Sequence, residues 1–265
     1  MNAEQGKLAS IAARKHAEAE ALLCAAAAMW SKAETVAPGP GFEVLRGGVI
    51  AEMKRRSPSG GELRPDLDPE VTAKAFVHAG AVALSVLTDE PDFGGSLDDL
   101  ARVRGVVDVP ILRKDFIVDP IQVAEARIAG ADWVLFIVAL LDDERLQACF
   151  EAATRSGAHA IVEVHDAGEA QRAVDAGAEC IGINNRNLRT LATDLTTFER
   201  VRGSIPESIV CVAESGIRDA AAAAAMVNAG ADAVLVGEAL MRAESPAALC
   251  ADIVSAVGAA AKRRS

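Results

Sequence analysis

A short pattern recurs along the chain: a helix-like stretch, a glycine and then an apolar run. The five clearest copies read HAGAVALSV, IAGADWVLFIV, RSGAHAIVEV, DAGAECIGI and NAGADAVLV, with glycines at Gly80, Gly130, Gly157, Gly177 and Gly230. Weaker copies at Gly105 and Gly203 fill the gaps, which makes seven copies spaced 20 to 27 residues apart. Glycine suits the end of a helix because it adopts left-handed backbone conformations, and an apolar run suits a strand. The pattern therefore predicts seven helix-to-strand junctions.

This repeat restricts the fold to an alternation of strands and helices. A unit of about 25 residues has room for one helix and one strand, and a first strand beginning near Val49 brings the strands to eight. Runs such as WVLFIV and AVLV are apolar on both faces, as in parallel strands covered by helices. We predict an α/β fold, a (β/α)8 TIM barrel with an N-terminal helical extension. The alternative, a doubly wound open sheet, usually has a glycine-rich phosphate loop after its first strand, and this chain lacks that motif.

The pattern also places the individual elements. We expect strands at residues 49–54, 82–87, 110–114, 132–137, 159–164, 180–184, 209–213 and 232–236. We expect helices at residues 69–79, 120–129, 142–156, 166–176, 219–229 and 246–260.

Residues 1–45 precede the repeats and form a separate N-terminal extension, while residues 46–265 form the barrel domain. Within residues 1–45, apolar residues recur at helical spacing, which predicts an amphipathic helix. These residues are Leu8, Ile11, Ala12, Ala19, Leu22, Leu23, Ala26 and Met29. The segment APGPGF then ends the helix before the barrel. The helix either caps the barrel or forms a lid over its mouth, and the pattern fits both.

Composition excludes several classes of function. The formal net charge of −11 argues against a nucleic-acid or anionic-membrane surface, because both require clustered Lys and Arg. No apolar run reaches the roughly 20 residues that span a bilayer. The five cysteines lack a CxxC motif, which favours reduced thiols and a cytoplasmic location. The four histidines are not clustered, so we expect no metal site. A monomer or a homodimer is expected.

Charged and amide side chains gather where the predicted strands end, the edge of such barrels that carries the active site. The groups at these positions are Glu52 and Lys54, Arg113 to Asp115, Glu163 and His165, Asn184 to Arg186, and Glu214 and Ser215. A single charge there would simply begin a loop. The whole set indicates a functional site, because ammonium and carboxylate groups crowded at one end of a barrel perturb each other's pKa values and suit acid–base chemistry.

An anion-binding site is indicated at the last two strands. ESG and VGEAL place Gly216 and Gly237 where backbone N–H groups approach a phosphate closely, the usual phosphate position in such barrels. Ser215 adds a hydroxyl, and Lys54 and Ser57 from the first strand can reach the same anion. We therefore expect a small phosphorylated substrate.

Seven motifs follow one another between roughly residues 42 and 250: IAEMKRRSPSGG, ALSVLTDEPDFGGSLDDL, PILRKDFIVDPIQVAEARIAGAD, VEVHD, GINNRNL, AESGI and LVGEALM. Together they resemble the motifs of the indole-3-glycerol phosphate synthases of tryptophan biosynthesis. The resemblance implies a (β/α)8 barrel that uses no metal and no organic cofactor. The implied substrate is 1-(2-carboxyphenylamino)-1-deoxyribulose 5-phosphate, which closes a ring onto its ketone carbon and then loses carbon dioxide and water.

The resemblance also implies roles for residues. Lys114 would be the general acid that protonates the ketone oxygen, and Glu163 would act in acid–base catalysis or orient that lysine. Glu52 and Lys54 would serve substrate binding and the dehydration, although spacing does not decide which lysine serves which step. The implied catalytic set is Glu52, Lys54, Lys114, Glu163, Asn184 and Glu214. The implied substrate-binding set is Ser57, Pro58, Phe93, Phe116, Arg186, Leu188, Ser215, Gly216, Gly237 and Glu238.

Two other functions are compatible with such a barrel. The first is another phosphosugar barrel enzyme, such as an isomerase or an aldolase. An aldolase needs a Schiff-base lysine on a late strand, and the sixth to eighth predicted strands end without a lysine. An inactive barrel that serves as a binding subunit is the other, but it would be expected to have lost some of the charged set. The chain departs from the family in having no tyrosine in the third barrel helix and Ala239 where serine is common.

Overall fold

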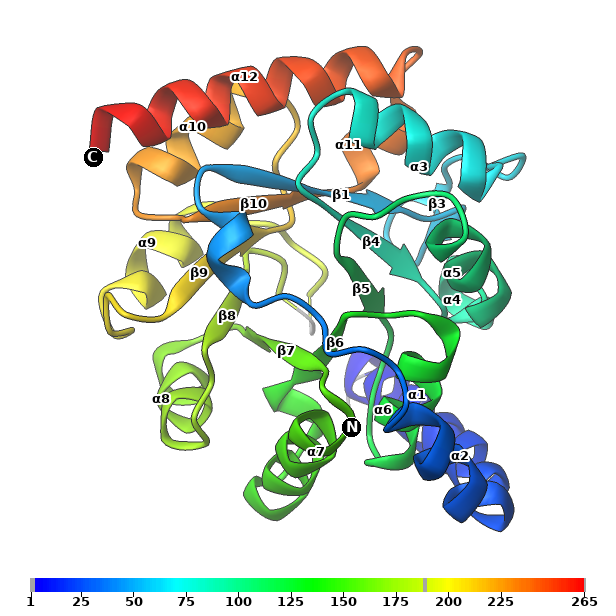
Figure 1. Cartoon of the computed structure of the whole chain (residues 1–265). Helices are drawn as coiled ribbons and strands as arrows, with labels where there is room; N and C mark the ends of the chain where they lie inside the picture. Colours follow the sequence, from blue (N-terminus) through cyan, green and yellow to red (C-terminus); the bar gives the residue numbers. More distant parts are fainter. Residues whose placement is uncertain (1–2, 188–189, 265) are drawn as a thin grey trace.

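Eight parallel strands close into a barrel in the computed structural model, which describes residues 3–187 and 190–264. The barrel order is β1-β10-β9-β8-β7-β6-β5-β4, and β1 pairs with both β4 and β10 (Figure 1). The strands are β1 (Gly48–Met53), β4 (Ala83–Leu87), β5 (Ile111–Lys114), β6 (Trp133–Ile137), β7 (His159–Val164), β8 (Cys180–Asn184), β9 (Val210–Glu214) and β10 (Ala233–Val236). The predicted barrel is confirmed, and each strand lies within one residue of its expected bounds at either end.

Helices surround the barrel on its outside, as Figure 1 shows. The main ones are α3 (Pro69–His78), α5 (Leu97–Arg104), α6 (Ile121–Ala129), α7 (Asp143–Ser156), α8 (Ala167–Asp175), α9 (Thr196–Arg202), α10 (Ala220–Asn228) and α12 (Pro246–Arg264). Two short helices, α4 (Glu90–Phe93) and α11 (Glu238–Arg242), and a small hairpin of β2 (Arg56–Ser57) and β3 (Gly61–Glu62) decorate the loops. The six expected helices are confirmed; α5 and α9 occupy the two units for which no helix bounds were expected.

The glycines of the repeat divide into two groups. All five of the clear copies have left-handed backbone, with φ between +66° and +114°. The glycines of the two weak copies do not, because Gly105 and Gly203 continue their helices with φ of −67° and −65°. A left-handed glycine is therefore the signature of the clear copies, whereas α5 and α9 end without one.

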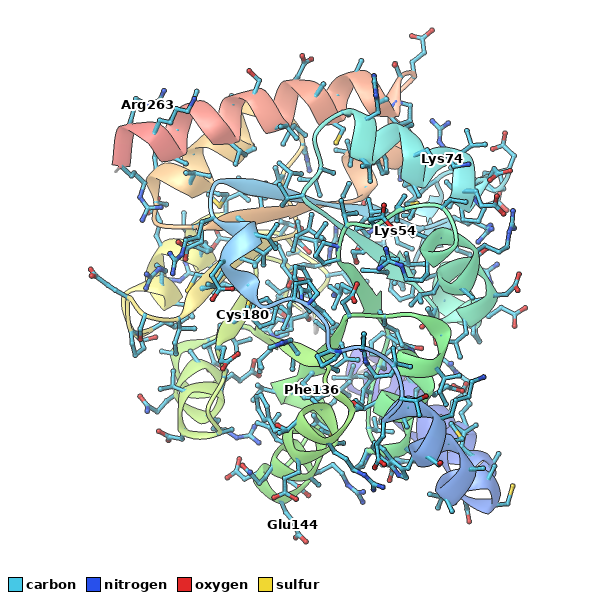
Figure 2. The ribbon with its side chains drawn as sticks, viewed as in Figure 1. Lys54, Lys74, Phe136, Glu144, Cys180 and Arg263 are labelled. Carbon is cyan, nitrogen blue, oxygen red and sulfur yellow. The ribbon has the colours of Figure 1, made fainter. Side chains whose placement is uncertain are left out.

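Apolar side chains form one core inside the barrel and another between the strands and the helices. The inner core includes Ile50, Leu112, Trp133, Leu135, Ile161 and Val212, all buried. Phe136 points outward from β6 into the outer core, where its ring meets Phe150 edge-on at 5.4 Å. Figure 2 shows this filled interior, with Lys74, Glu144 and Arg263 outside on the exposed helix surfaces.

The segment between α2 and β1 crosses the amino-terminal end of the barrel, here called the floor (Figure 1). It contains the short turn η2 (Phe42–Leu45), whose Phe42 ring packs against Trp133 at 5.1 Å and His159 at 5.6 Å. The Trp133 indole N–H also donates to the carbonyl of Pro40 at 2.8 Å. The floor is therefore closed by aromatic packing, which leaves the opposite end as the open one.

The N-terminal extension consists of α1 (Ala3–Leu22), the turn η1 (Leu23–Ala25) and α2 (Ala26–Ala33), so the expected helix is interrupted once. Ala19 and Ala33 pack on Ile121 and Ala124 of α6. Lys15, only 3% exposed, bridges from α1 to the barrel. Its ammonium lies 2.7 Å from Asp115 and 3.2 Å from Asp89. Within the described part of the chain, no helix is long and apolar enough to cross a membrane.

Candidate active site

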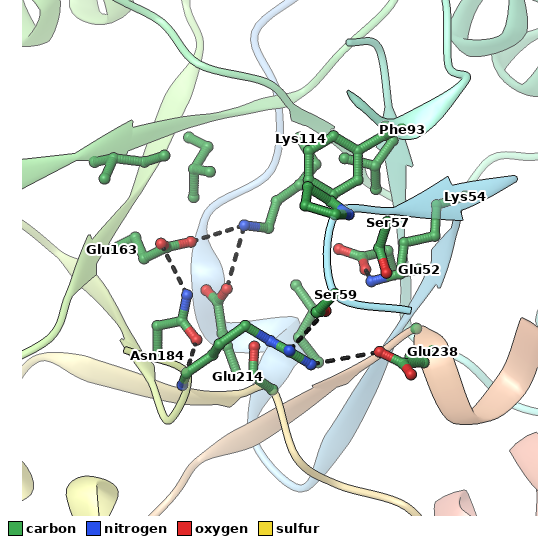
Figure 3. Close-up of a pocket in the computed structure, with 18 of the residues that line it drawn as sticks. Glu52, Lys54, Ser57, Ser59, Phe93, Lys114, Glu163, Asn184, Glu214 and Glu238 are labelled. Atoms are coloured by element: carbon green, nitrogen blue, oxygen red, sulfur yellow. Dashed lines mark hydrogen bonds and ion pairs between the residues drawn. The ribbon is translucent and has the colours of Figure 1, made fainter. Parts of the chain in front are cut away.

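A cavity opens at the carboxyl ends of the strands, the end called the mouth here (Figure 3). Of the sixteen site residues expected from the sequence, fifteen line it: Glu52, Lys54, Ser57, Pro58, Phe93, Lys114, Phe116, Glu163, Asn184, Arg186, Glu214, Ser215, Gly216, Gly237 and Glu238. Leu188 lies outside the described residues. The ends of parallel strands meet at one edge, which brings together side chains far apart in the sequence.

Lys114 lies at the centre of the mouth, at the end of β5. Its ammonium donates to Glu163 Oε2 at 2.7 Å and lies 3.5 Å from Glu214 Oε2. Figure 3 shows Lys114 pointing toward both carboxylates. The Asn184 amide donates to the second oxygen of Glu163 at 2.9 Å, which fixes the orientation of that carboxylate. Lys114 is therefore shared between two buried carboxylates that belong to β7 and β9.

Charges in this cluster shift one another's pKa values. Burial lowers the pKa of Lys114, but the carboxylates of Glu163, Glu214 and Glu52 outweigh burial and raise it. Burial likewise raises the pKa of Glu163, but the nearby Lys114 and His165 outweigh that effect and lower it. Lys114 is therefore protonated and Glu163 ionised over the neutral pH range, which makes the first an acid and the second its anionic partner.

Glu214 differs from Glu163 in its protonation. Burial raises its pKa to about 7; Lys114 opposes this shift, while the charges of Glu163 and Glu52 add to it. Among the described residues, no group hydrogen-bonds to Glu214 Oε1, although this oxygen is buried. A Cβ at position 182 would lie 2.1 Å from the same oxygen, so Gly182 makes room for it. Glu214 can therefore gain and lose a proton near neutral pH inside the cavity.

Glu52 and Lys54 form a second charged pair at the end of β1. The Lys54 ammonium donates to Glu52 Oε1 at 2.5 Å, and the Ser85 hydroxyl donates to Oε2 at 3.4 Å. The two side chains therefore lie on the same side of the strand, as their spacing predicts. A Cβ at Gly237 would come within 2.3 Å of Glu52 Oε1, so only glycine fits there while this pair is in place.

Apolar side chains form one wall of the cavity. The rings of Phe93 and Phe116 lie 6.1 Å apart and are tilted by 41°. Leu8 and Ile11 of α1 line the same cavity, which brings the N-terminal extension to the mouth. These two residues were missed as site residues, because helical periodicity shows that they form an apolar face but not what that face contacts. The wall suits a flat aromatic ring.

The loop after β9 has strained backbone where the sequence indicates an anion site. Ser215 has φ of +64°, which is unusual for a residue with a side chain, and Gly216 follows with φ of +80°. A Cβ at Gly216 would lie 2.4 Å from Thr193 Cγ2. Such strain concentrates at functional sites, where the surrounding structure maintains it.

Arg186 reaches across the mouth from the end of β8. It donates to the Ser59 hydroxyl at 2.7 Å and the Leu191 carbonyl at 3.2 Å, and it lies 3.4 Å from Glu238 Oε2. The Arg242 Nε also donates to Glu238, at 3.1 Å. The side chain of Glu238, a residue of the expected substrate-binding set, therefore contacts two arginines at the mouth.

The geometry of the cavity defines a class of protein. It is a (β/α)8-barrel enzyme with a buried acid–base cluster, an apolar wall and glycine loops that suit an anion. Within the described residues, no three His, Cys, Asp or Glu side chains converge in a way that could hold a metal ion.

Comparison with known proteins identifies the family. The family model described as indole-3-glycerol phosphate synthase matches residues 9–253, so the chain belongs to this family. It is 53% identical over 219 residues to the indole-3-glycerol phosphate synthase of Streptomyces griseus subsp. griseus, covering 82% of this chain and 81% of that protein. It is 50% identical over 222 residues to the Parafrankia sp. protein of the same name, covering 83% of each. It is 52% identical over 219 residues to indole-3-glycerol phosphate synthase 1 of Streptomyces coelicolor, covering 82% and 81%.

Proposed function

We propose that this chain converts 1-(2-carboxyphenylamino)-1-deoxyribulose 5-phosphate into indole-3-glycerol phosphate, carbon dioxide and water. Membership of the family supports this reaction. The observation that carries it is the buried Lys114 ammonium, 2.7 Å from Glu163 and 3.5 Å from Glu214, at the mouth of the barrel. Ring closure onto a ketone requires a proton on the ketone oxygen, and a charged lysine in a dry site supplies one.

The first step joins the ring carbon that bears the carboxylate to the ketone carbon. Lys114 donates its proton to the ketone oxygen as the carbon–carbon bond forms, which turns that oxygen into a hydroxyl. Carbon dioxide then leaves, and the electron pair of the broken bond restores the aromatic ring. Glu163 holds the lysine in place during this step, because its own orientation is fixed by the amide of Asn184.

The second step removes water. The new hydroxyl leaves with a proton supplied by an acid, while a base takes a proton from the five-membered ring to complete the indole. Glu214 suits one of these roles because its pKa is raised to about 7, near the pH at which it must exchange protons. The pair of Glu52 and Lys54 suits the other, since its ammonium and carboxylate lie in contact within the same cavity.

The ends of the substrate fit opposite parts of the cavity. The aromatic ring lies against Phe93 and Phe116, whose apolar faces exclude water from the reacting carbons. The phosphate lies at Ser215, Gly216 and Gly237, where glycine allows backbone N–H groups to approach closely. Arg186 lines the same cavity and offers its guanidinium to the ring carboxylate until that group leaves as carbon dioxide.

A direct assay tests this proposal. Purified protein is mixed with the carboxyphenylamino ribulose phosphate in buffer that contains a chelator, and the appearance of indole fluorescence is followed. Release of carbon dioxide in equal amount confirms that decarboxylation accompanies ring closure. A well-folded protein that forms no indole product would refute the synthase function. Conversion of the substrate into a sugar phosphate isomer instead would support the rival class of barrel isomerases.

A further inference from the structure

His165 lies next to Glu163, a member of the charged cluster around Lys114, and has no role in the reaction described above. It follows the end of β7, and its side chain is 14% exposed. Its Nε2 lies 3.4 Å from Glu163 Oε1, while its Nδ1 lies 3.0 Å from Glu169 Oε2 of α8. The imidazole is therefore placed between two carboxylates, one of which holds Lys114. His165 itself does not line the cavity.

These contacts favour a positively charged ring. Glu169 Oε2 accepts from the His165 backbone N–H at 2.8 Å and faces Nδ1, so Nδ1 must carry a hydrogen. Nε2 is buried and makes no hydrogen bond among the described residues, but it lies close enough to the Glu163 carboxylate for that charge to favour a positive ring. With a carboxylate near each nitrogen, the arrangement favours protonation of both. His165 is therefore an imidazolium, in line with its pKa, which burial lowers but Glu163 and Glu169 together raise to about 10.

We propose that His165 is a positioning residue that keeps Glu163 ionised and in place when Lys114 gives up its proton. The inference rests on the proposed function, in which Lys114 is the acid of ring closure. In the resting site Glu163 has two cations, with Lys114 on Oε2 and His165 beside Oε1. Once Lys114 becomes a neutral amine, the imidazolium is the cation that remains beside the carboxylate. Glu163 then stays an anion and takes up no proton itself, so its negative charge favours reprotonation of the Lys114 amine.

Other charges near this pair do not replace His165. Glu214 and Glu52 add negative charge to the cluster, as their effect on Lys114 shows. Glu169 faces His165 rather than Glu163, and Asp166 beside it accepts from the Glu169 backbone N–H at 2.9 Å to cap α8. The Asn184 amide donates to Glu163 Oε1 but carries no charge. Among the described contacts of Glu163, Lys114 and His165 are thus the cations.

The test compares His165, which follows β7, with His159, the first residue of that strand. His165→Asn removes the imidazolium but keeps a polar side chain, and His159→Asn is the matched control at the other end of the strand. Loss of a cation at this distance raises the pKa of Glu163, so the acid limb of the kcat profile should move to higher pH by roughly one to two pH units. KM should change less than about twofold, because His165 does not touch the cavity. Glu169→Gln should move the limb in the same direction by less.

A second measurement, nitrogen NMR of the imidazole rings, determines the protonation state of His165 directly. The chain has four histidines, so the imidazole nitrogen signals that are lost in His165→Asn identify those of His165 in the unmodified protein. We expect these signals to show an imidazolium at pH 7.5. A neutral imidazole there would overturn the inference, and so would a kcat profile of His165→Asn that superimposes on that of the unmodified enzyme. If the unmodified enzyme forms no indole product, the proposed function fails instead, and the nitrogen signals still decide the ionic state of His165.

Discussion

Strand β7 begins with one histidine and is followed directly by another, and the two sites illustrate how the floor and the mouth of the barrel differ. At the floor, His159 lies at the surface against the Phe42 ring, 3.5 Å from the exposed Glu179. Toward the mouth, His165 is more deeply buried between two carboxylates, one of which, Glu163, also contacts Lys114. One strand therefore connects an end stabilised by packing with an end that concentrates charge.

The floor also uses charge, but for a different purpose. Arg202 donates to the carbonyls of Ile205 and Gly230 at 2.8 and 3.2 Å, and Arg264 donates to those of Val227 and Ala231, both at 2.9 Å. These cations satisfy the free carbonyls at helix ends and complement the helix dipoles. Charges at the mouth crowd each other instead. The floor is thus built for stability and the mouth for chemistry, in agreement with the general division in this fold.

Replacement of Lys114 should have the largest effect at the mouth. Lys114→Met removes the proposed acid, so kcat should fall by about 10³-fold, within the usual contribution of acid–base catalysis. The fold should persist, because Glu163 and Glu214 can take up protons once the ammonium is gone. Measurement of kcat by indole fluorescence, with circular dichroism as a check of folding, tests this. Lys74→Met on the outer surface of α3 is the matched control, and a Lys114→Met enzyme within tenfold of normal turnover would remove Lys114 from the mechanism.

Replacement of Phe42 should show the opposite pattern. Phe42→Ala removes a ring that is 4% exposed and packs on Trp133, so the free energy of unfolding should fall by about 4 kcal/mol, typical of a buried aromatic ring. Turnover of the fraction that remains folded should stay within about twofold, since the floor lies at the far end from the cavity. Urea unfolding followed by circular dichroism measures the free energy of unfolding. Phe93→Ala at the mouth is the matched variant, and it is expected to raise KM with little change in stability. An equal loss of stability in the two variants would contradict the division between a stabilising floor and a catalytic mouth.

Most of the strands and helices of the barrel could be predicted from the sequence, because they depend on short-range regularities. The left-handed glycines and apolar runs repeat along the chain, and parallel strands bring every strand end to one edge. The presence of Glu52, Lys114, Glu163 and Glu214 in one cavity follows from that topology. Their roles in catalysis stay predictions, since they come from resemblance to the family.

The remainder depends on contacts between segments that no periodicity connects. Leu8 and Ile11 reach the mouth because Lys15 attaches α1 to Asp89 and Asp115, two acidic residues far along the chain. The ion pair of Arg186 with Glu238 likewise joins two loops across the cavity. The spacing of residues predicts which face a side chain occupies, but not which distant segment covers that face. The extension could therefore be predicted as a helix, and its position could not.

Replacement of Glu214 should raise stability and lower activity, in a manner that depends on pH. The folded protein raises the pKa of Glu214 from 4.5 to about 7, so an ionised Glu214 disfavours the fold. The unmodified protein therefore loses stability relative to Glu214→Gln as the pH rises from 4.5 through 7. Above pH 8 the variant should be more stable by about 3 kcal/mol, since each tenfold change in proton affinity corresponds to about 1.4 kcal/mol.

Urea unfolding at pH 4.5, 6 and 8 tests this dependence, together with kcat at each pH. Glu179→Gln, a change at an exposed carboxylate near the floor, should alter the free energy of unfolding by less than about 0.5 kcal/mol. If Glu214→Gln were equally stable relative to the unmodified protein at all three pH values, Glu214 would not titrate differently in the folded and unfolded states. The suggestion that it exchanges protons during dehydration would then lose its support.

The smallest effect is expected at an exposed ion pair of the floor. Arg46 donates to Asp232 Oδ1 at 2.8 Å, but the arginine side chain is 52% exposed, so Arg46→Ala should cost no more than about 0.5 kcal/mol and less in high salt. Asp232→Ala should cost about 1 to 2 kcal/mol, because Asp232 Oδ2 also accepts from the Cys211 backbone N–H at 2.9 Å, which would lose its partner. Urea unfolding of both variants at 50 and 500 mM salt separates the two contributions, and kcat should be unchanged in each. A large, salt-sensitive loss in Arg46→Ala would mean that surface charge, and not packing and backbone hydrogen bonds, maintains the floor.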